Sequence, residues 1–378
     1  MEEWKEYKLG EITNMKNGKK RPQNNGVFPV YGGNGIMDYS DSYNAENAII
    51  VGRVGAYCGC VYKCESKCWV SDNAISIFAK DIADTQFLYY LMTTLDFHHH
   101  HIGGAQPLMT QDIIGDFTVS IPPLAIQHQI IQILKSLDDK IEVNKRINDN
   151  LEQQAQALFK SWFVDNPDSN WANTSLSEVA SFVGGYSYKS EELTDFSNVA
   201  MATIKNFGRN RGFKAEGFKG ITPSAKLKEC HYVNLFDILV AHTDLTQNAD
   251  VIGNAELLLT CGKYNSIIFS MDLVKVLPKE IFPYSFLLAA MLKNKMFKGH
   301  CLGYINGTTV LHLNKKALPE FEIRKPSDSE AKIMNETLAP YYKRMAKLLQ
   351  ETDKLISLRD TLLPKLMSGE VKINETNN

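Results

Sequence analysis

Four cysteines and a run of histidines are the side chains best suited to binding a metal. Cys58, Cys60, Cys64 and Cys68 have the spacing C-x-C-x3-C-x3-C, which lacks the paired C-x2-C of zinc ribbons and favours free thiols around a hairpin. The histidine run at 98–101 is expected to end a helix near solvent, although protonated rings could also contact phosphates. The odd total of seven cysteines is typical of a reducing cytoplasm. We therefore predict no metal site.

Motifs for methyl transfer, nucleotide binding and metal-dependent cleavage are missing or out of place. The segment Asn166-Pro167-Asp168 lacks the second proline and the aromatic residue of an adenine methyltransferase turn, and the sequence has no Gly-Lys-Ser/Thr phosphate loop. A cofactor-binding unit would have a helix after its glycine loop and then a strand that ends in an acidic residue. The sequence after the glycines of 31–35 predicts neither element. Asp328, Glu330 and Lys332 have the residue types of a nuclease, but they open a predicted helix. We predict no catalytic residue and no cofactor bound to this chain.

Two loops near the start combine basic, amide and aromatic side chains with glycines. Their candidate nucleic-acid contacts are Lys19, Lys20, Arg21, Tyr31 and Asn34. Lysines of this kind contact phosphates, and glycines allow the backbone to approach a ligand closely. A solvated turn followed by a tight hairpin is an equally good interpretation.

Two further residues of the first half have side chains that suit base edges. Arg53 follows a predicted buried strand and has Gly52 and Gly55 around it, so it could bind a guanine edge with two hydrogen bonds. Gln106 could pair with adenine. The alternative for Arg53 is a structural salt bridge, and the alternative for Gln106 is an amide that caps a turn.

The second half contains the densest mixture of basic and aromatic residues. Its candidate contacts are Tyr186, Tyr188, Lys189, Lys205, Asn206, Arg209 and Arg211. A run of charges is also typical of a solvated face, so both interpretations stay open.

An internal repeat organises the chain. Trp4, Leu9, Glu11, Ile12 and Gly18 recur as Trp171, Leu176, Glu178, Val179 and Gly185, each 167 positions later. Each half continues with short β-rich segments, a buried strand that enters a loop, a polar turn and a last strand. By their positions in the repeat, His242, Thr243, Asn306 and Thr308 are further candidate contacts.

A long helix is expected after each half. In both, apolar residues fall at three- and four-residue spacing, as on one helix face. The residues expected to pair the helices are Ile130, Leu137, Ile141, Asn144, Leu151, Leu158, Met345, Leu348, Leu355 and Leu362. A helix of about 37 residues is roughly 55 Å long and must bury its stripe against a partner, for which the other helix is the obvious choice. Asn144 would set the register, Ser327 and Glu330 form a capping-box pattern, and Ser368-Gly369 offers a stop.

Composition is that of an ordinary globular protein. The 378 residues are 44% hydrophobic and 22% charged, with no apolar run long enough for a membrane helix and no leader-like start, so we expect a cytoplasmic location and no membrane partner. The formal net charge of -2 does not favour nucleic-acid binding, but a local patch suffices, and only 171–326 has an excess of basic residues.

The order of these features resembles the DNA-specificity subunits of type I restriction-modification systems. The resemblance rests on Leu-Gly-Glu-Ile at 9–12, Val-Gly-Arg-Val-Gly at 51–55, Gly-Ala-Gln-Pro at 104–107 and Ile-Pro-Pro-Leu at 121–124, which opens the first long helix. It covers nearly the whole chain. The second half departs from the pattern, with His242 where the family often has an arginine and Asn306-Gly-Thr-Thr in place of the Gly-Gln-Pro type of turn.

The resemblance implies an α+β fold with two β-rich target recognition domains in tandem, each followed by a long helix, the helices pairing as an antiparallel coiled coil. The expected boundaries are 1–124, 125–165 (central helix), 166–326, 327–370 (second helix) and 371–378 (tail).

The resemblance also implies a non-catalytic function. Each domain would read one half of a split, asymmetric site in double-stranded DNA, and the helices would set the gap between the half-sites. The helix pair would bind two methyltransferase subunits and, through them, two restriction subunits, which hold S-adenosylmethionine, ATP and Mg. The alternative is a coiled-coil scaffold that binds proteins and has no DNA specificity.

Overall fold

The computed structural model describes residues 4–103, 106–209, 212–224 and 226–372. The chain divides into two compact units, the first formed by 1–140 with 355–378 and the second by 141–354. Each long helix contributes one part to each unit. No helix in the described ranges is both long and apolar enough to cross a membrane.

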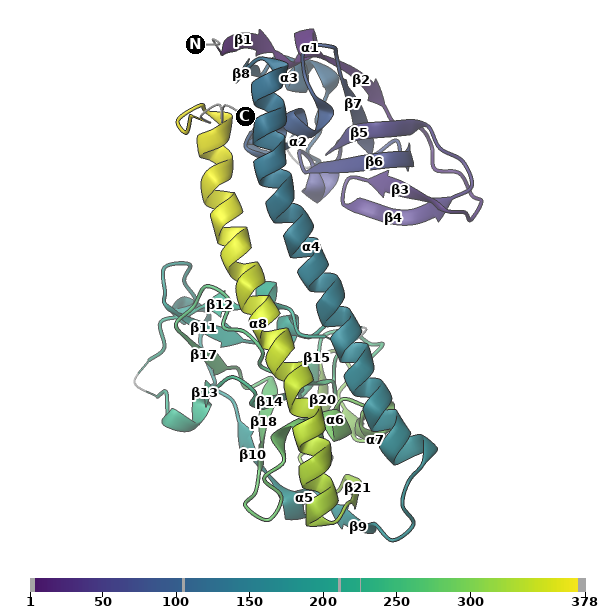
Figure 1. The fold of residues 1–378 in the computed structure, drawn as a ribbon, viewed down its shortest axis with the longest axis vertical. Helices are drawn as coiled ribbons and strands as arrows, with labels where there is room; N and C mark the ends of the chain where they lie inside the picture. The colour runs from purple at the N-terminus through teal and green to yellow at the C-terminus, as the bar shows by residue number, and fades with distance from the viewer. Residues whose placement is uncertain (1–3, 104–105, 210–211, 225, 373–378) are drawn as a thin grey trace, which may run out of the picture. The chain divides into compact units, whose positions relative to one another are not determined.

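The first unit is built on a six-stranded sheet with the order β2-β7-β5-β6-β3-β4 (Figure 1). Its strands are β2 (Thr13–Asn17), β3 (Phe28–Gly32), β4 (Gly35–Ser40), β5 (Ala45–Gly52), β6 (Val61–Val70) and β7 (Ala74–Ala79). The centre of β5 reads Ala-Ile-Ile-Val and is fully buried, as expected for a strand covered on both faces. A separate antiparallel pair joins β1 (Lys5–Lys8) to β8 (Thr118–Ile121).

Helices cover one face of this sheet. They are α1 (Leu9–Ile12), α2 (Thr85–Thr93), α3 (Gln111–Gly115) and the first part of α4 (Leu124–Lys160). Asp84 caps α2 by accepting hydrogen bonds from the backbone amides of Gln86 and Phe87. Ile130 and Leu134 of α4 join Leu366 of α8 (Asp328–Met367) in the main core of the unit.

The second unit has more but shorter strands. One sheet has the order β10-β18-β14-β16, with β10 (Ala180–Gly184), β14 (Ile238–Ala241), β16 (Ala255–Leu257) and β18 (Leu273–Pro278). A second has the order β12-β11-β17-β13, with β11 (Val199–Ala202), β12 (Lys219–Gly220), β13 (Tyr232–Val233) and β17 (Ser266–Phe269). Smaller sheets join β9 (Ala172–Ser175) to β21 (Glu322–Lys325), and β15 (Thr243–Asp244) and β19 (Ile305–Asn306) to β20 (Leu311–Leu313).

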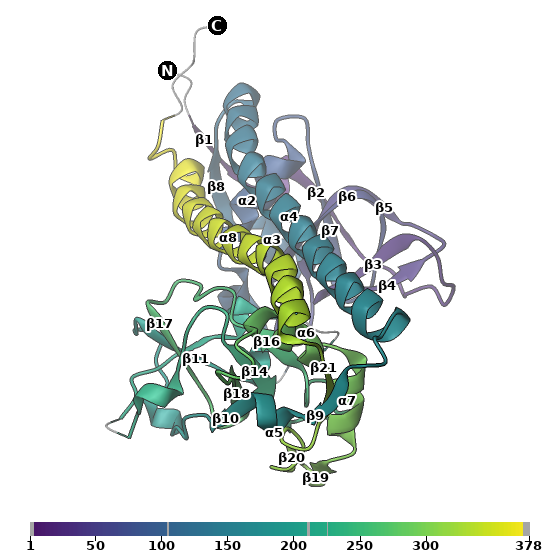
Figure 2. The ribbon, with the colours of Figure 1, turned by 60° about the horizontal axis from the view of Figure 1, so that its bottom comes forward.

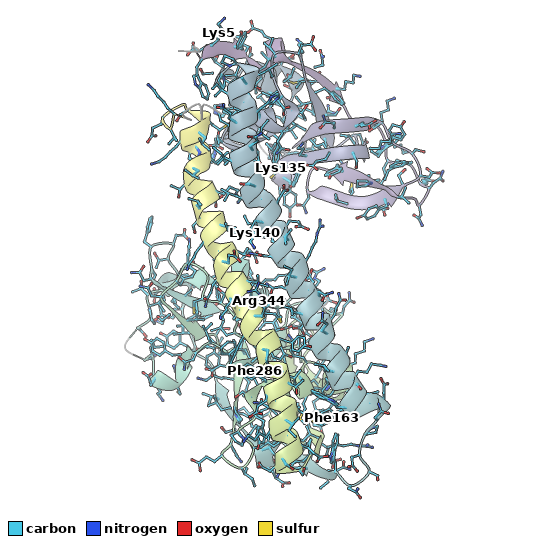
Figure 3. All side chains as sticks on the ribbon, viewed as in Figure 1. Lys5, Lys135, Lys140, Phe163, Phe286 and Arg344 are labelled. Carbon is cyan, nitrogen blue, oxygen red and sulfur yellow. The ribbon has the colours of Figure 1, made fainter. Side chains whose placement is uncertain are left out.

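The helices of the second unit are α5 (Leu176–Val179), α6 (Ser285–Leu292), α7 (Lys295–Leu302) and parts of α4 and α8 (Figure 2). Figure 3 labels Phe163, after the end of α4, and Phe286 of α6. The Phe163 ring lies 4.9 Å from that of Trp171 between centroids, and the Phe286 ring stacks on Tyr342 of α8 at 5.8 Å. These contacts join the end of α4 to the segment before β9, and α8 to α6.

The internal repeat of the sequence is also present in the boundaries of the strands and helices. The run β1, α1, β2 spans 5–17 and the run β9, α5, β10 spans 172–184, so every boundary shifts by the same 167 residues. β1 pairs with β8 in the same antiparallel manner as β9 with β21. The predicted fold class, two β-rich domains that are each followed by a long helix, is therefore confirmed.

The two long helices lie antiparallel. In the first unit Asp138 of α4 accepts a hydrogen bond from Arg359 of α8 at 3.0 Å. In the second unit Asn144 is fully buried, and its Nδ2 donates to Thr352 Oγ1 at 3.4 Å and to Glu351 Oε2 at 3.2 Å. The residues proposed for the pairing face are buried (Ile130, Ile141, Asn144, Met345, Leu348) or half-buried (Leu137, Leu151, Leu158, Leu355, Leu362).

The predicted ends of the second helix match its observed boundaries. The Ser327 amide donates to Glu330 Oε2 at 2.9 Å, and the Glu330 amide donates to Ser327 Oγ at 3.4 Å, which is a capping box. The helix ends at Met367, and Gly369 has φ +72°, the left-handed backbone that stops a helix.

Candidate nucleic-acid interface

In the first unit, backbone hydrogen bonds hold three candidate segments together where several strands of the sheet end. The Lys19 amide donates to the Val70 carbonyl at 3.0 Å, and the Ser71 amide donates to the Tyr31 carbonyl at 2.9 Å. The Arg53 amide donates to the Asn73 carbonyl at 2.9 Å. The loop around 71–73 is therefore the common support of the segments that contain Lys19, Asn34 and Arg53.

A glycine makes this approach possible. A Cβ atom on Gly18 would lie 1.9 Å from the Ser71 carbonyl oxygen, which no side chain tolerates. In the second unit, Gly185 stands in the same place, and its Cβ would lie 2.0 Å from the Ser270 carbonyl oxygen. The glycine that recurs in the sequence thus has the same packing role in both units.

A further loop reaches the same strand ends in the first unit. The Met109 amide donates to the Arg53 carbonyl at 2.8 Å, and the Gly55 amide donates to the Pro107 carbonyl at 3.1 Å. Gln106 is therefore on the segment that packs beside Arg53, and its side chain is exposed. Gly104 and Ala105, part of the predicted motif there, lie outside the described residues.

The side chains at these strand ends are mostly available for a ligand. Lys19, Lys20, Arg21 and Asn34 are exposed and Arg53 is half-buried. Arg21 forms an ion pair with Asp38. Arg53 has only a 3.5 Å contact from Nη1 to the Asp72 carbonyl, and no carboxylate in the described ranges pairs with it. The salt-bridge alternative for Arg53 therefore has no support.

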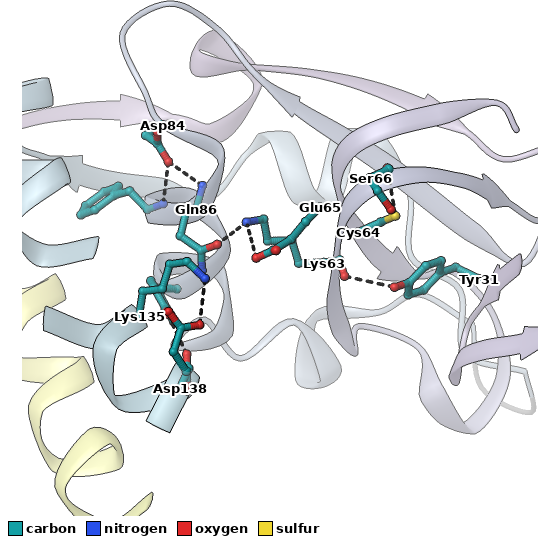
Figure 4. A network of polar contacts seen from close by, with 12 residues as sticks. Tyr31, Lys63, Cys64, Glu65, Ser66, Asp84, Gln86, Lys135 and Asp138 are labelled. Atoms are coloured by element: carbon teal, nitrogen blue, oxygen red, sulfur yellow. Dashed lines mark hydrogen bonds and ion pairs between the residues drawn. The ribbon is translucent and has the colours of Figure 1, made fainter. Parts of the chain in front are cut away.

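Tyr31 has a different role from the one predicted. It is 8% exposed, and its hydroxyl donates to the Lys63 carbonyl at 3.2 Å. Burial raises the pKa of Tyr31. Figure 4 shows that the Lys63 side chain in turn reaches Gln86 of α2. Tyr31 fixes the strand that leads into the Asn34 turn, so we leave it out of the proposed contacts.

The second unit repeats the backbone arrangement with other side chains. The His242 amide donates to the Asp272 carbonyl at 2.8 Å, and the His242 carbonyl accepts from the Leu313 amide at 2.9 Å. His242 therefore occupies the place that Arg53 has between Asn73 and Met109. Burial and the nearby His312 lower the pKa of His242, which favours its neutral form. A neutral imidazole offers one donor and one acceptor where Arg53 offers a charged fork.

Three predicted contacts of the second unit are buried and serve the fold. The Tyr186 hydroxyl donates to Glu192 Oε1 at 2.8 Å, and Thr243 Oγ1 donates to Asp272 Oδ1 at 3.0 Å. Asn206 is fully buried, and its side chain accepts from the Thr203 amide and donates to the Lys214 carbonyl. We leave these side chains out of the proposed contacts because they cannot reach a base without leaving their partners.

The remaining candidates of this unit are accessible. Lys189, Lys205, Arg209, Asn306 and Thr308 are exposed, and Tyr188 and His242 are half-buried. Lys189 lies 3.3 Å from Glu191, and Arg209 lies 3.5 Å from Asp250. Arg211 lies outside the described residues.

Two loop-supporting residues were not among the predicted ones. The Asp244 carboxylate is 1% exposed and accepts from the amides of Thr246, Val251 and Ile252, so it shapes the loop that follows His242. Gln247 Nε2 donates to the Thr308 carbonyl at 2.6 Å and joins this loop to the Asn306 turn. The Asp-x-Thr pattern of an Asx turn was the available signal for Asp244.

The cysteine cluster belongs to the core of the first unit. Cys58, Cys64 and Cys68 are buried and Cys60 is half-buried, all as free thiols. His98 Nδ1 bonds to the Cys58 carbonyl at 2.9 Å. In the described ranges, no three His, Cys, Asp or Glu side chains are placed to hold a metal ion.

Comparison with known proteins gives a family match over most of the chain. The model of the type I restriction modification DNA specificity domain matches residues 1–153 and again 168–357. The HindI specificity subunit of Haemophilus influenzae is 26% identical over 330 residues, which covers 71% of this chain and 72% of the relative. The MjaIX specificity subunit of Methanocaldococcus jannaschii is 23% identical over 323 residues, covering 79% and 72%.

A solved structure has the same fold. The crystal structure of the type I restriction-modification system S subunit from M. genitalium superposes with a TM-score of 0.60 at 17% sequence identity, and the match covers 97% of this chain and 96% of that one.

Proposed function

The chain belongs to the family of type I restriction-modification DNA specificity proteins, and from this premise we propose that it reads a bipartite, asymmetric site in double-stranded DNA, one half-site per β-rich domain. It is a specificity subunit and not an enzyme. We assign 1–124 and 166–326 as the recognition domains, 125–165 and 327–370 as the helices that join them, and 371–378 as a tail, of which 373–378 lie outside the described residues.

The observation that carries this proposal is the duplicated junction at Arg53 and His242. Each residue follows a buried strand, and each is held by backbone bonds on both sides, to Asn73 and Met109 or to Asp272 and Leu313. The two places have the same backbone and different side chains. A pair of equivalent supports with different reading groups is what an asymmetric DNA site requires.

The proposed contacts divide by chemistry. Lys19, Lys20, Arg21, Lys189 and Lys205 serve phosphates and set the register, whereas Asn34, Arg53, Gln106, Tyr188, Arg209, His242, Asn306 and Thr308 face base edges. Arg53 takes guanine with two hydrogen bonds and Gln106 takes adenine.

The helices serve the partner proteins in this proposal. Both expose large apolar side chains away from their pairing face, with Val143 at 45%, Ile333 at 63% and Leu358 at 46%. Exposed apolar side chains at several positions along the helices are available for a protein contact. We assign this surface to two methyltransferase subunits, through which two restriction subunits join. S-adenosylmethionine, ATP and Mg then belong to those partners, and the complex works in the cytoplasm, where the seven free cysteines stay reduced.

Methylation sequencing tests the proposal. Cells that make this chain with a candidate methyltransferase subunit are compared with cells that lack the chain. We expect a motif of two short half-sites, separated by a fixed unread gap, that is methylated on both strands only when the chain is present. An unchanged pattern with a partner shown to be active on another specificity subunit would contradict the proposal and favour a protein-binding scaffold.

A further inference from the structure

Three charged side chains meet inside the second unit. Lys293, which follows α6, has its Nζ 2.6 Å from Glu256 Oε2 and 3.1 Å from Glu152 Oε1. The exposed fractions are 4% for the Lys293 side chain, 3% for Glu256 and 18% for Glu152. Buried ion pairs are often no more stabilising than apolar residues of the same size, so their presence here points to a role other than stability.

One end of this charge cluster reaches a candidate recognition segment. Glu256 Oε1 accepts a hydrogen bond from the Gly212 amide at 2.6 Å. Asn254 Nδ2, two residues earlier, donates to the Gly208 carbonyl at 3.1 Å, and the Gly208 amide donates to the Gly212 carbonyl at 2.8 Å. Asn254, just before β16, therefore bonds to Gly208, and Glu256, within β16, bonds to Gly212, so the two side chains contact the chain before and after Arg209.

The other end of the cluster lies on the long helices. Glu152 belongs to α4, where its Oε1 also accepts from Gln156 Nε2 at 2.9 Å. The Lys293 ammonium lies 6.0 Å from the ring centroid of Tyr342 on α8. Burial opposes charge on both partners, lowering the pKa of Lys293 and raising that of Glu256, while the neighbouring Glu256 and Glu152 raise the pKa of Lys293 overall. A continuous path of polar contacts therefore runs from α4 through Lys293 and Glu256 to Gly212.

The first unit has uncharged residues in the corresponding places. By the strand register, Glu256 pairs with Leu239 of β14 as Tyr62 pairs with Ile50 of β5. Lys293 follows α6 as its C-cap residue, the position that Thr94 has after α2. The two first-unit positions compared, both among the described residues, carry no charge, so the first half-site serves as an internal control.

We propose that Glu256 and Lys293 are positioning residues for the second half-site: their ion pair, anchored on Glu152 of α4, holds the segment that carries Arg209 in the orientation that reads DNA. This inference rests on the proposed function and adds to it a residue set that shapes specificity without touching DNA.

The test uses the full chain with its methyltransferase partner and a library of sites in which each half-site is varied separately. In Glu256→Gln the amide keeps the shape of the side chain and leaves Lys293 without its closest charge. We expect discrimination among bases of the second half-site to fall by at least about tenfold, while discrimination at the first stays within about twofold. Lys295→Met, which removes an exposed lysine two residues from Lys293, is the matched control and should behave as the wild type.

A second variant guards against a folding defect. Asn254→Ala releases the Gly208 end of the segment without disturbing a buried charge, and it should loosen the same half-site. If folded Glu256→Gln and Asn254→Ala discriminate among bases of the second half-site as well as the wild type does, the inference is wrong. An equal loss of discrimination at both half-sites would also overturn it. If the wild-type chain itself methylates no defined site, the proposed function fails and this inference falls with it.

Discussion

At the scale of single residues, the proposed function assigns base reading at equivalent backbone positions to two different side chains, Arg53 and His242. Both sit between two backbone hydrogen bonds that fix their Cα positions, so the identity of the side chain decides what is read. Arg53→Ala should reduce discrimination for its base at the first half-site by about 1–3 kcal/mol. Arg53→Lys should recover little of this loss because a lysine cannot form the two parallel hydrogen bonds of the guanidinium. Fluorescence anisotropy with sites altered one base at a time measures both effects.

Lys20→Ala is the control for the Arg53 variants. A phosphate contact adds affinity for every sequence, so its loss should weaken binding to cognate and unrelated DNA alike. The slope of log K against log salt should become shallower by about one. A change of base preference in Lys20→Ala, or none in Arg53→Ala, would reverse the roles assigned to these residues.

The lowered pKa of Glu192 gives a prediction of how the stability of the second unit depends on pH. Hydrogen bonds from the amides of Lys189 and Ser224 and from the Tyr186 hydroxyl hold the pKa of Glu192 at about 2, below its ordinary value of 4.5. A depressed carboxylate pKa stabilises the fold above pH 4.5, and the contribution is lost as the pH falls from 4.5 toward 2. Glu192→Gln should therefore be less stable than the wild type in urea at pH 7, and the difference should shrink at pH 3. A difference that is constant with pH would contradict this assignment.

Sequence reasoning did not distinguish buried from exposed polar side chains in the proposed recognition loops. Tyr186, Asn206 and Thr243 have the residue types of DNA contacts, but each is buried and hydrogen-bonded within the protein. A polar side chain that caps a turn and one that meets a base look alike in sequence, because both need only a donor or an acceptor. The distinction depends on burial, which the tertiary packing decides.

At the scale of elements, the repeated glycine gives a prediction with a control beside it. Gly185→Ala places a Cβ against the Ser270 carbonyl, whereas a Cβ on Gly184 meets nothing within 4 Å. Gly185→Ala should cost about 1–3 kcal/mol of unfolding free energy and impair reading of the second half-site. Gly184→Ala should be nearly neutral in the same urea titration and methylation assay. Equal effects of the two substitutions would contradict the close approach.

The buried Asn144 gives a prediction for the helix pair. Asn144→Ala removes a partner of Thr352 and leaves a buried hydroxyl without its donor, which should cost about 1–3 kcal/mol in urea unfolding. Because replacing both partners by apolar groups is nearly neutral, Asn144→Leu with Thr352→Val should recover most of the loss. Lys145→Ala, at an exposed position next to Asn144, is the control. If the double variant were as unstable as Asn144→Ala, the loss would not be explained by a buried hydroxyl left without its hydrogen-bond donor.

Helices and repeats were predictable, and sheet order was not. Three- and four-residue spacing together with a capping box identified α8 and its ends, since these signals are local. The parallel pairs β3 with β6 and β11 with β17 join segments that are distant along the chain. Nothing in a short apolar run says which strand it will lie beside, so these pairings come only from the packed structure.

At the scale of the whole molecule, a chain with net charge -2 is proposed to bind a polyanion. The charge and the proposal are compatible because exposed basic candidates such as Lys19, Lys20 and Arg209 lie in loops, while the carboxylates Glu152, Glu256 and Asp138 pair with basic side chains of the protein itself. Charge that is neutralised internally does not repel DNA. Binding should therefore follow the local loops rather than the overall composition, which is why composition alone gave no prediction here.

In the proposed function the two long helices set the gap between the half-sites, which gives a prediction about helix length. Seven residues inserted into α4 near Asn144, with seven inserted into the facing part of α8 near Thr352, lengthen the pair by about 10 Å and preserve its apolar spacing. Since base pairs rise by about 3.4 Å, the unread gap should widen by about three base pairs while both half-sites keep their sequences. Methylation sequencing reads the gap directly. An insertion into α4 alone should abolish site-specific methylation, because the helix faces no longer match. If the doubly extended chain kept the original gap, the helices would not be the element that spaces the half-sites.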